Sequence, residues 1–231
     1  MLRFPSPLIQ VEIQAGSGSY PIQLPSQELF RVDHIFKHQE YSIPNHLLPD
    51  RALTVVDIGA NVGLFTLYMR LLRAGTTIHC FEPVPGTLAL LKVNLNGMQG
   101  VHVHPYGLSN TTGRTAMHLH PYNTGENSLK PTSTQSGQLI EIEIQDAEAA
   151  FRRIQLNDID ILKIDTEGCE VEILESLHSR LECIGIILLE YHSEADRRRI
   201  DQLLDNFVLF EACVARPGLG LLKYANPSGP K

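Results

Sequence analysis

The seven residues Asp57-Ile58-Gly59-Ala60-Asn61-Val62-Gly63 carry the clearest fold signal in this chain of 231 residues. An apolar run precedes them, and an apolar pattern of helical period follows from 62 to 73. Glycines between a strand and a helix indicate a tight turn, in which backbone N–H groups and the start of the helix can approach a ligand. In an open parallel sheet, such a turn lies beyond the carboxyl end of a strand, where ligands bind.

The pattern around this turn alternates strands with helices. We expect strands at 52–58, 76–82, 101–104, 159–165, 183–191, 207–213 and 219–225, helices at 62–73, 85–97, 146–155, 168–179 and 194–205, and an antiparallel pair at 115–120 and 139–144. Unbroken apolar runs such as 184–189 suit strands that are covered on both faces. The expected fold class is α/β, a doubly wound, mainly parallel sheet with helices on both faces.

Two further segments lie outside this alternation. Residues 1–50 contain two expected strands at 8–14 and 20–24, a helix at 27–38 and the start of a Pro-bounded connector, and we expect them to form an extension that caps the domain of residues 51–231. The segment 121–138 is rich in Asn, Thr, Ser and Gly and long for a loop in a compact domain. Such loops are often functional, so this one is a candidate substrate lid.

Composition limits the classes of partner. The net charge is −7, which disfavours nucleic acid, and no apolar run approaches the roughly 18 residues that span a bilayer. The first residues lack a signal-peptide pattern, so we expect a cytoplasmic protein. The four cysteines lack Cys-x-x-Cys spacing, and the alternating histidines from 102 to 120 fit half-exposed strands better than a metal site. The oligomeric state is left open.

The turn differs from the dinucleotide fingerprint G-x-G-x-x-G, because it reads Gly59-x-Asn61-x-Gly63 and has Asp57 two residues before its first glycine. A pyrophosphate would meet that carboxylate as a like charge. S-adenosylmethionine has no phosphate, and its amino and sulfonium groups are cationic. Glu82 lies about 20 residues beyond the turn, where a carboxylate can accept hydrogen bonds from both ribose hydroxyls of either cofactor. The Asp57 carboxylate therefore favours S-adenosylmethionine.

Other nucleotide and hydrolase motifs are missing from the sequence. It contains no phosphate-binding G-x-x-x-x-G-K-[ST] loop and no G-x-S-x-G nucleophile elbow. Two alternatives to a methyltransferase stay open, namely an NAD-type oxidoreductase and a non-catalytic, partner-binding domain on the same fold.

Three motifs in order resemble the FkbM-type methyltransferases over roughly residues 27 to 213. They are Val55-Val56-Asp57-Ile58-Gly59-Ala60-Asn61-Val62-Gly63, Phe81-Glu82-Pro83-x-Pro85 and Leu162-Lys163-Ile164-Asp165-Thr166-Glu167-Gly168-Cys169-Glu170. The resemblance implies a class I methyltransferase fold with a seven-stranded sheet, and O-methylation of a hydroxyl on a sugar, glycan, polyketide or other secondary metabolite. Cys169 departs from the family pattern, in which His or Ala is frequent at this position.

The resemblance and the turn together predict a donor site for S-adenosylmethionine, with S-adenosylhomocysteine as the product. The predicted donor-binding residues are Asp57, Gly59, Asn61, Gly63, Glu82 and Pro83. Asn127 and Ser128 lie where the family has a small polar segment that faces the substrate, so the resemblance implies that they contact a small-molecule or glycan acceptor.

The acceptor side is predicted from the ends of two later strands. Methylation of an alcohol removes the hydroxyl proton, so Asp165, at a strand end, is the first candidate for the base, and Glu167 is a candidate to share the proton or orient the acceptor. His192 is a further candidate for the base, and Glu190 for substrate binding. Asp165, Glu167 and Glu190 could offer oxygen ligands to Mg²⁺, but their spacing does not demand a metal and none is predicted.

Overall fold

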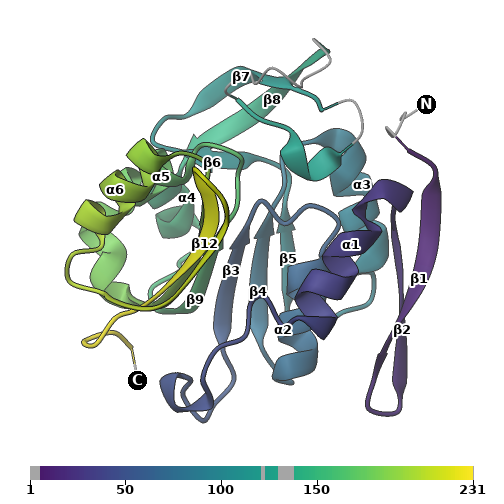
Figure 1. The fold of residues 1–231 in the computed structure, drawn as a ribbon, viewed down its shortest axis with the longest axis horizontal. Coiled ribbons are helices and arrows are strands. Elements are labelled where there is room, and N and C mark those ends of the chain that lie inside the picture. The colour runs from purple at the N-terminus through teal and green to yellow at the C-terminus, as the bar shows by residue number, and fades with distance from the viewer. Residues whose placement is uncertain (1–5, 121–122, 130–137, 231) are drawn as a thin grey trace.

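The computed structural model describes residues 6–120, 123–129 and 138–230. Its centre is a seven-stranded sheet in the order β11-β12-β10-β9-β3-β4-β5 (Figure 1). The strands are β3 (Thr54–Ile58), β4 (Thr77–Phe81), β5 (Val101–His104), β9 (Ile159–Ile164), β10 (Ile184–Tyr191), β11 (Val208–Arg216) and β12 (Leu219–Ala225). Those from β10 to β5 are parallel, whereas β12 is antiparallel to both of its neighbours. The expected mainly parallel sheet is confirmed.

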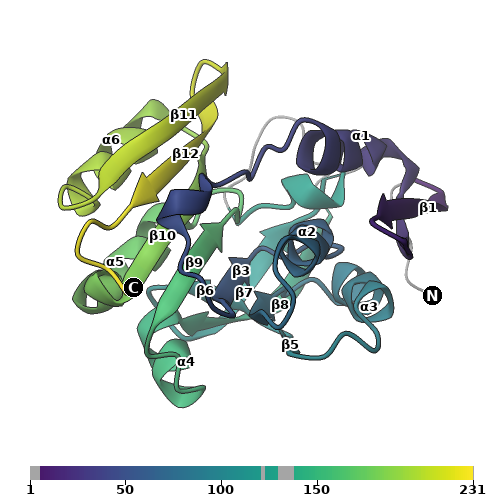
Figure 2. The same ribbon diagram turned by 90° about the horizontal axis from the view of Figure 1, so that it is seen from below.

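Helices cover both faces of this sheet (Figure 2). They are α2 (Leu64–Leu72) and α3 (Pro85–Asn94) on one face, and α4 (Ala147–Arg153), α5 (Glu170–Ser176) and α6 (Glu194–Leu203) on the other. Successive side chains of a strand point to opposite faces, so Val55 packs in the core under α2 while Val56 packs in the core under α5. The expected helices are confirmed, although a 3₁₀ segment, His178–Cys183, follows the shorter α5.

A second, three-stranded sheet lies above the carboxyl ends of β3, β4 and β5 (Figure 1). It contains β6 (Gly107–Ser109), β7 (Gly113–His118) and β8 (Leu139–Asp146). The antiparallel β7–β8 pair matches the expectation, whereas β6 was not predicted because it is only three residues long. Of the expected lid, the structure describes 123–129, which contains a 3₁₀ turn, Thr124–Glu126, and the rest lies outside the described residues.

The N-terminal hairpin of β1 (Leu8–Ala15) and β2 (Gly18–Pro25) lies against α3, where the Gln23 N–H donates to Asn94 Oδ1 at 2.8 Å. A helical run follows, made of the 3₁₀ turn Ser26–Glu28, α1 (Leu29–Val32) and a π-helical segment, Asp33–Lys37. The prediction of one α-helix at 27–38 is thus wrong in pitch. Glu28 and Ile35 are buried and Arg31 is half-buried, so the run still turns one face inward.

Apolar side chains of the N-terminal segment belong to the main core. Ile22, Leu24 and Tyr41 are buried in the same cluster as Val55 and Leu67. A short 3₁₀ turn, Asn45–Leu47, then leads into β3. The division at residue 50 stays a prediction. Within the described ranges, no helix has both the length and the apolar character needed to cross a bilayer.

Candidate active site

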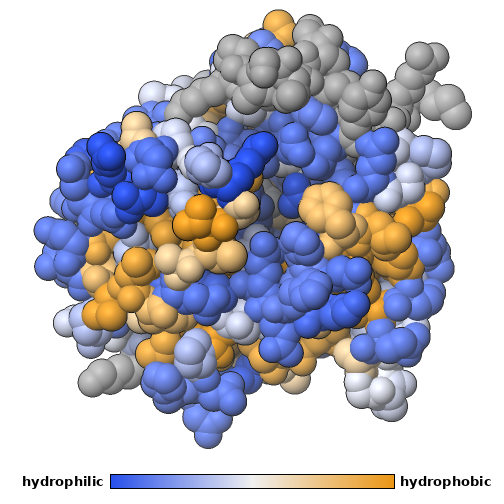
Figure 3. Space-filling model, viewed as in Figure 1, coloured by the Kyte–Doolittle hydropathy of each residue, from blue (hydrophilic) through white to orange (hydrophobic). Residues whose placement is uncertain are grey.

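A pocket lies beyond the carboxyl ends of β3, β4 and β9. Its floor comes from the large sheet, one wall from the small sheet, and its roof from the N-terminal segment and the loop before β8. The floor residues include Gly59, Asn61, Glu82, Pro83, Asp165 and Glu167, the wall residues Gly107, Leu108, Met117, Ile142 and Ile144, and the roof residues Arg31, Thr124, Gly125 and Asn127. Figure 3 shows this face as a hydrophilic strip between apolar areas over β11–β12 and over α1 with β1–β2.

The turn after β3 requires glycine at its first position. Gly59 has a φ of 76°, and a Cβ added there would lie 1.8 Å from the Asp165 carbonyl oxygen. The N–H groups of Gly59 and Ala60 donate to the Phe81 carbonyl, at 3.1 and 3.0 Å. Asn61 is also left-handed, at φ 49°, and lines the pocket. Gly63 packs against α3 and does not line the pocket, so the turn presents only part of the predicted motif to a ligand.

Glu82 supplies a carboxylate to the predicted donor site. It is buried, and its two oxygens accept the N–H groups of Val84 at 2.9 Å and of Asn61 at 3.1 Å. Burial raises the pKa of Glu82 to about 7, although both hydrogen bonds oppose this. Each carboxylate oxygen has a second lone pair, so the side chain can still accept hydrogen bonds from ligand hydroxyls.

Asp57 lies beneath the turn and not in the pocket. It is fully buried, and its oxygens meet the Thr66 hydroxyl at 2.8 Å and the Lys163 ammonium at 3.2 Å. Lys163 also donates to the Gly59 carbonyl at 2.8 Å and lies 3.5 Å from Asp165 Oδ2. Burial opposes the charge of Lys163, but Asp57 and Asp165 outweigh it and raise the lysine pKa. Asp57 therefore supports the turn through Lys163.

This placement weakens the argument that Asp57 repels a pyrophosphate, because its charge is paired below the pocket. Its direct contact with a donor stays a prediction. No role was predicted for Lys163, although a lysine within the largely apolar strand 159–164 was a usable signal, since buried lysines are rare without partners.

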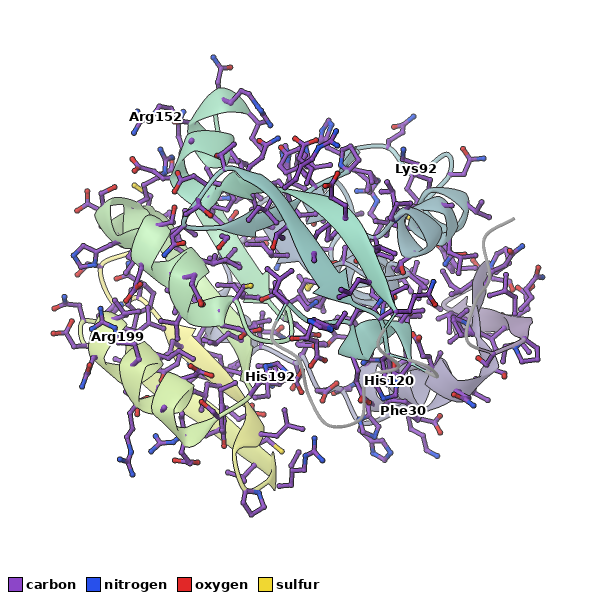
Figure 4. All side chains as sticks on the ribbon, turned by 90° about the horizontal axis from the view of Figure 1, so that it is seen from above. Phe30, Lys92, His120, Arg152, His192 and Arg199 are labelled. Atoms are coloured by element: carbon purple, nitrogen blue, oxygen red, sulfur yellow. The ribbon has the colours of Figure 1, made fainter. Side chains whose placement is uncertain are left out.

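The four residues predicted on the acceptor side come together at the border of the pocket, where Asp165 and Glu167 line it. Their ligating atoms, from Asp165, Glu167, Glu190 and His192, all lie within 4.8 Å of one another. His192 Nε2 is 3.1 Å from Glu167 Oε2 and 3.7 Å from Glu190 Oε2, and Nδ1 is 3.6 Å from Glu170 Oε1. Figure 4 shows His192 near the middle of the molecule, between the α5–α6 side and the α1 side. We call these four residues the acidic quartet.

The residues of the acidic quartet differ in the direction in which their pKa values are shifted. Burial raises the pKa of Glu190 to about 9, and the nearby charge of Asp165 adds to this. Burial also opposes ionisation of Asp165, but the positive charges of Lys163 and Arg31 outweigh it and lower the Asp165 pKa. Burial would lower the pKa of His192, yet Glu167 and Glu170 raise it to about 11. At neutral pH His192 is thus a proton donor in the absence of other ligands, which disfavours the predicted role of base.

The roof joins segments that are distant in sequence. Glu28 is fully buried and accepts the Thr124 N–H at 2.7 Å and hydroxyl at 2.5 Å, and the Asn61 amide lies 3.4 Å from its other oxygen. Arg31 lines the pocket, with its guanidinium packed on Gly125. Sequence reasoning missed Glu28, Arg31 and Thr124 because no motif joins them and only folding brings them together.

Asn127 and Ser128 border the acceptor side. Asn127 lines the pocket, and its side-chain oxygen accepts the His120 N–H at 2.9 Å. Ser128 pairs with His118 in a β-bridge and donates its hydroxyl hydrogen to the Glu167 carbonyl. These contacts tie the loop to β7 and to the acidic quartet. Their contact with an acceptor stays a prediction.

Solved structures of similar fold include the Aeropyrum pernix fibrillarin in complex with S-adenosylmethionine, with a TM-score of 0.55 and 10% identity, covering 94% of this chain and 82% of that one. A putative rRNA methylase from Clostridium thermocellum has a TM-score of 0.51 and 11% identity, covering 90% and 99%. These neighbours show the class I methyltransferase fold. Because proteins named for RNA substrates occur among them, the expectation that nucleic acid is not a partner stays untested.

The sequence relatives include several proteins named methyltransferases. Methyltransferase sdnD of Sordaria araneosa is 26% identical over 227 residues, covering 84% of this chain and 86% of that one. The hexuronic acid methyltransferase AglP of Haloferax volcanii is 24% identical over 149 residues, covering 64% and 59%. The family model described as "Methyltransferase FkbM domain" matches residues 57–216. The chain therefore belongs to the FkbM methyltransferase family.

Proposed function

We propose that this chain transfers a methyl group from S-adenosylmethionine to a hydroxyl of a sugar, glycan or secondary metabolite. One observation supports the proposal most directly: the glycine turn, Glu82 and Asp165 all line a single pocket. A hexuronic acid methyltransferase among the relatives supports a carbohydrate-like acceptor. We also expect the protein to act in the cytoplasm.

The donor end fits S-adenosylmethionine in shape and chemistry. The missing Cβ of Gly59 leaves the floor open, and Val84, Leu108 and Ile142 offer an apolar wall for a purine. Glu82 can accept hydrogen bonds from ribose hydroxyls, and the Asp165 carboxylate lies where it can attract a cationic amino group or sulfonium. When bound, S-adenosylmethionine supplies a methyl group activated by its positively charged sulfur.

The chain's own residues prepare the acceptor. Asp165 lines the pocket between the donor end and the rest of the acidic quartet, so its carboxylate can accept the acceptor hydroxyl's hydrogen bond and take up the proton as the new C–O bond forms. Glu167 and Glu190 can orient further hydroxyls, which suits a polyhydroxylated acceptor. Lys163 keeps Asp165 close to the glycine turn and so positions it relative to the donor.

Calorimetric titration with S-adenosylhomocysteine tests the donor half of the proposal. We expect saturable binding of S-adenosylhomocysteine by the folded wild-type chain. NAD is the comparison ligand, because Glu82 could also accept hydrogen bonds from its ribose, and we expect no comparable heat with it. Absence of binding at millimolar S-adenosylhomocysteine, in protein shown to be folded by circular dichroism, would overturn the proposal. Tight binding of NAD would instead support the oxidoreductase alternative.

The acceptor half needs a turnover assay. Transfer of radiolabelled methyl from the donor to a panel of uronic acids, sugars and hydroxylated metabolites should identify an O-methylated product by mass spectrometry. Donor binding without transfer to any hydroxyl, but with transfer to nitrogen or to nucleic acid, would contradict the O-methylation part while leaving the donor site intact.

A further inference from the structure

We propose that Asp165, Glu167, Glu190 and His192 bind one divalent cation at the border of the pocket, which Asp165 and Glu167 line. Asp165 and Glu167 follow β9, and Glu190 and His192 lie at the end of the neighbouring parallel strand β10. Because both strands end at the same edge of the sheet, the fold brings together four ligand side chains that the sequence separates.

The spacing of the acidic quartet matches one coordination sphere. All four ligating atoms lie within 4.8 Å of one another. An octahedral ion with ligands near 2.1 Å separates adjacent ligand atoms by about 3 Å and opposite ones by about 4.2 Å. The distances from His192 Nε2 to Glu167 and Glu190, 3.1 and 3.7 Å, fall in this range. A single ion can therefore contact all four residues after small side-chain adjustments.

The histidine ring provides a separate argument. Both ring nitrogens of His192 are inaccessible to solvent, and among the described residues neither has a well-aligned hydrogen-bond partner. Glu167 is close enough for a hydrogen bond, so the missing element is direction rather than distance. Buried polar atoms normally have partners. A cation between the ring and the carboxylates would give the nitrogen and the oxygens a common partner.

The charge of the acidic quartet points the same way. Three carboxylates face one imidazole, and the nearest ammonium, Lys163, is already shared with Asp57 and the Gly59 carbonyl. The positive charge beside the acidic quartet is thus shared among several carboxylates. A divalent ion supplies further positive charge.

The neighbouring Glu170 carboxylate already accepts hydrogen bonds from the protein. Its Oε1 accepts hydrogen bonds from the Thr166 N–H and hydroxyl, at 2.9 Å each, and from the Gly168 N–H at 3.2 Å. The ligand set is therefore a defined group within a larger acidic region and does not extend to every carboxylate nearby.

Three carboxylates and one imidazole suit Mg²⁺ or Mn²⁺, and the nitrogen ligand favours Mn²⁺ of the two. The ion's role rests on the proposed methyl transfer, whereas its binding does not. At the acceptor end it would bind two neighbouring oxygens of a polyhydroxylated acceptor and lower the pKa of the hydroxyl to be methylated.

Titration of the chelator-treated protein with Mn²⁺ alone, followed by electron paramagnetic resonance of the free ion, tests the site. We expect one site per chain, with affinity weakened about tenfold or more in Glu167→Gln and in Glu190→Gln. Glu28→Gln is the matched control, because it removes a buried carboxylate that lies behind the pocket residue Thr124 and is not a proposed ligand. Two ligand variants keep the test valid if one fails to fold.

S-Adenosylhomocysteine titration of the same samples separates the two proposals. If the wild type binds S-adenosylhomocysteine but shows no Mn²⁺ site at millimolar metal, the metal proposal is overturned and the proposed function stands. Equal weakening by Glu28→Gln and Glu167→Gln also overturns it, since general charge would then explain binding. A specific Mn²⁺ site in a protein that does not bind S-adenosylhomocysteine supports the metal site and contradicts the proposed function.

Discussion

The donor and acceptor ends of the pocket are built in different ways. At the donor end, each polar group has a backbone partner: Glu82 accepts two N–H groups, and Gly59 donates to Phe81. At the acceptor end, carboxylates and a histidine face one another with few backbone contacts. The donor end is thus held largely by backbone hydrogen bonds, whereas the side chains of the acceptor end interact mainly with one another. The following predictions test this difference.

The largest effect is expected from Gly59→Ala. The new Cβ would lie 1.8 Å from a backbone carbonyl at a φ of 76°, so the turn must rearrange. We expect a loss of more than about 4 kcal/mol in unfolding free energy and no measurable S-adenosylhomocysteine binding. Gly97→Ala is the matched control, because it has a φ of 78° but nothing within 4 Å of the added Cβ. It should cost only about 1–2 kcal/mol in chemical denaturation. Equal losses would show that φ strain alone explains the effect.

Asp165→Asn should separate catalysis from donor binding. Removing the proposed base should lower kcat about a thousandfold. S-adenosylhomocysteine affinity should fall only severalfold, because the variant loses one charge attraction to the amino group and keeps the glycine turn and Glu82. Asp160→Asn, at the other end of β9, is the control: it breaks a pair with Arg51 outside the pocket and should affect stability but not turnover. Unchanged kcat in Asp165→Asn would contradict the assignment of the base.

Lys163→Met tests whether Lys163 links the glycine turn to Asp165. The variant leaves Asp57 buried without its ammonium partner and should lose about 3 kcal/mol of unfolding free energy. Donor affinity should also fall, because the Gly59 carbonyl loses its donor. Lys223→Met removes another buried lysine, which pairs with Glu211 away from the pocket, and should leave donor affinity unchanged. If both variants weaken donor binding equally, Lys163 has no special role at the turn.

Glu82 should make donor binding depend on pH, with the smallest effect of the four. Its ionised form accepts ribose hydroxyls better, and its pKa in the free protein is about 7. Affinity for S-adenosylhomocysteine should therefore fall as pH drops below 7, by at most about tenfold per pH unit. Glu82→Gln should bind more weakly and lose this dependence. A wild-type affinity that is constant from pH 8 to pH 5.5 would contradict the argument.

The raised pKa of Glu82 also makes the free energy of unfolding depend on pH, in the opposite direction to donor affinity. The folded-state pKa of Glu82 lies above the ordinary value of 4.5, so the native state binds more protons than the unfolded state between these two pH values. Its contribution to stability is therefore greatest at low pH and is lost as pH rises toward 7. Thermal denaturation of the wild type and Glu82→Gln across this window should show the difference.

Local patterns in the sequence predicted most of the fold. Apolar strands, a glycine turn and helical periods are short-range signals, and the strands and helices they predicted are present. The helix expected at 27–38 shows the limit, since the apolar period predicts a helix there but not that it is divided into 3₁₀, α and π segments. β6 was not predicted because three residues are too few to show the alternating pattern of a strand.

The sequence by itself determined the strand–turn–helix of the donor end and the residue types at the ends of β9 and β10, because each belongs to one continuous stretch. Only the tertiary structure decided that Asp57 lies below the pocket, that Lys163 links it to Asp165, and that Glu28 reaches Thr124. The physical reason is that burial and charge pairing depend on which distant segments meet. A sequence motif shows which charged residues are present. The fold determines which of them are paired in the interior and which line the pocket, where a ligand can contact them.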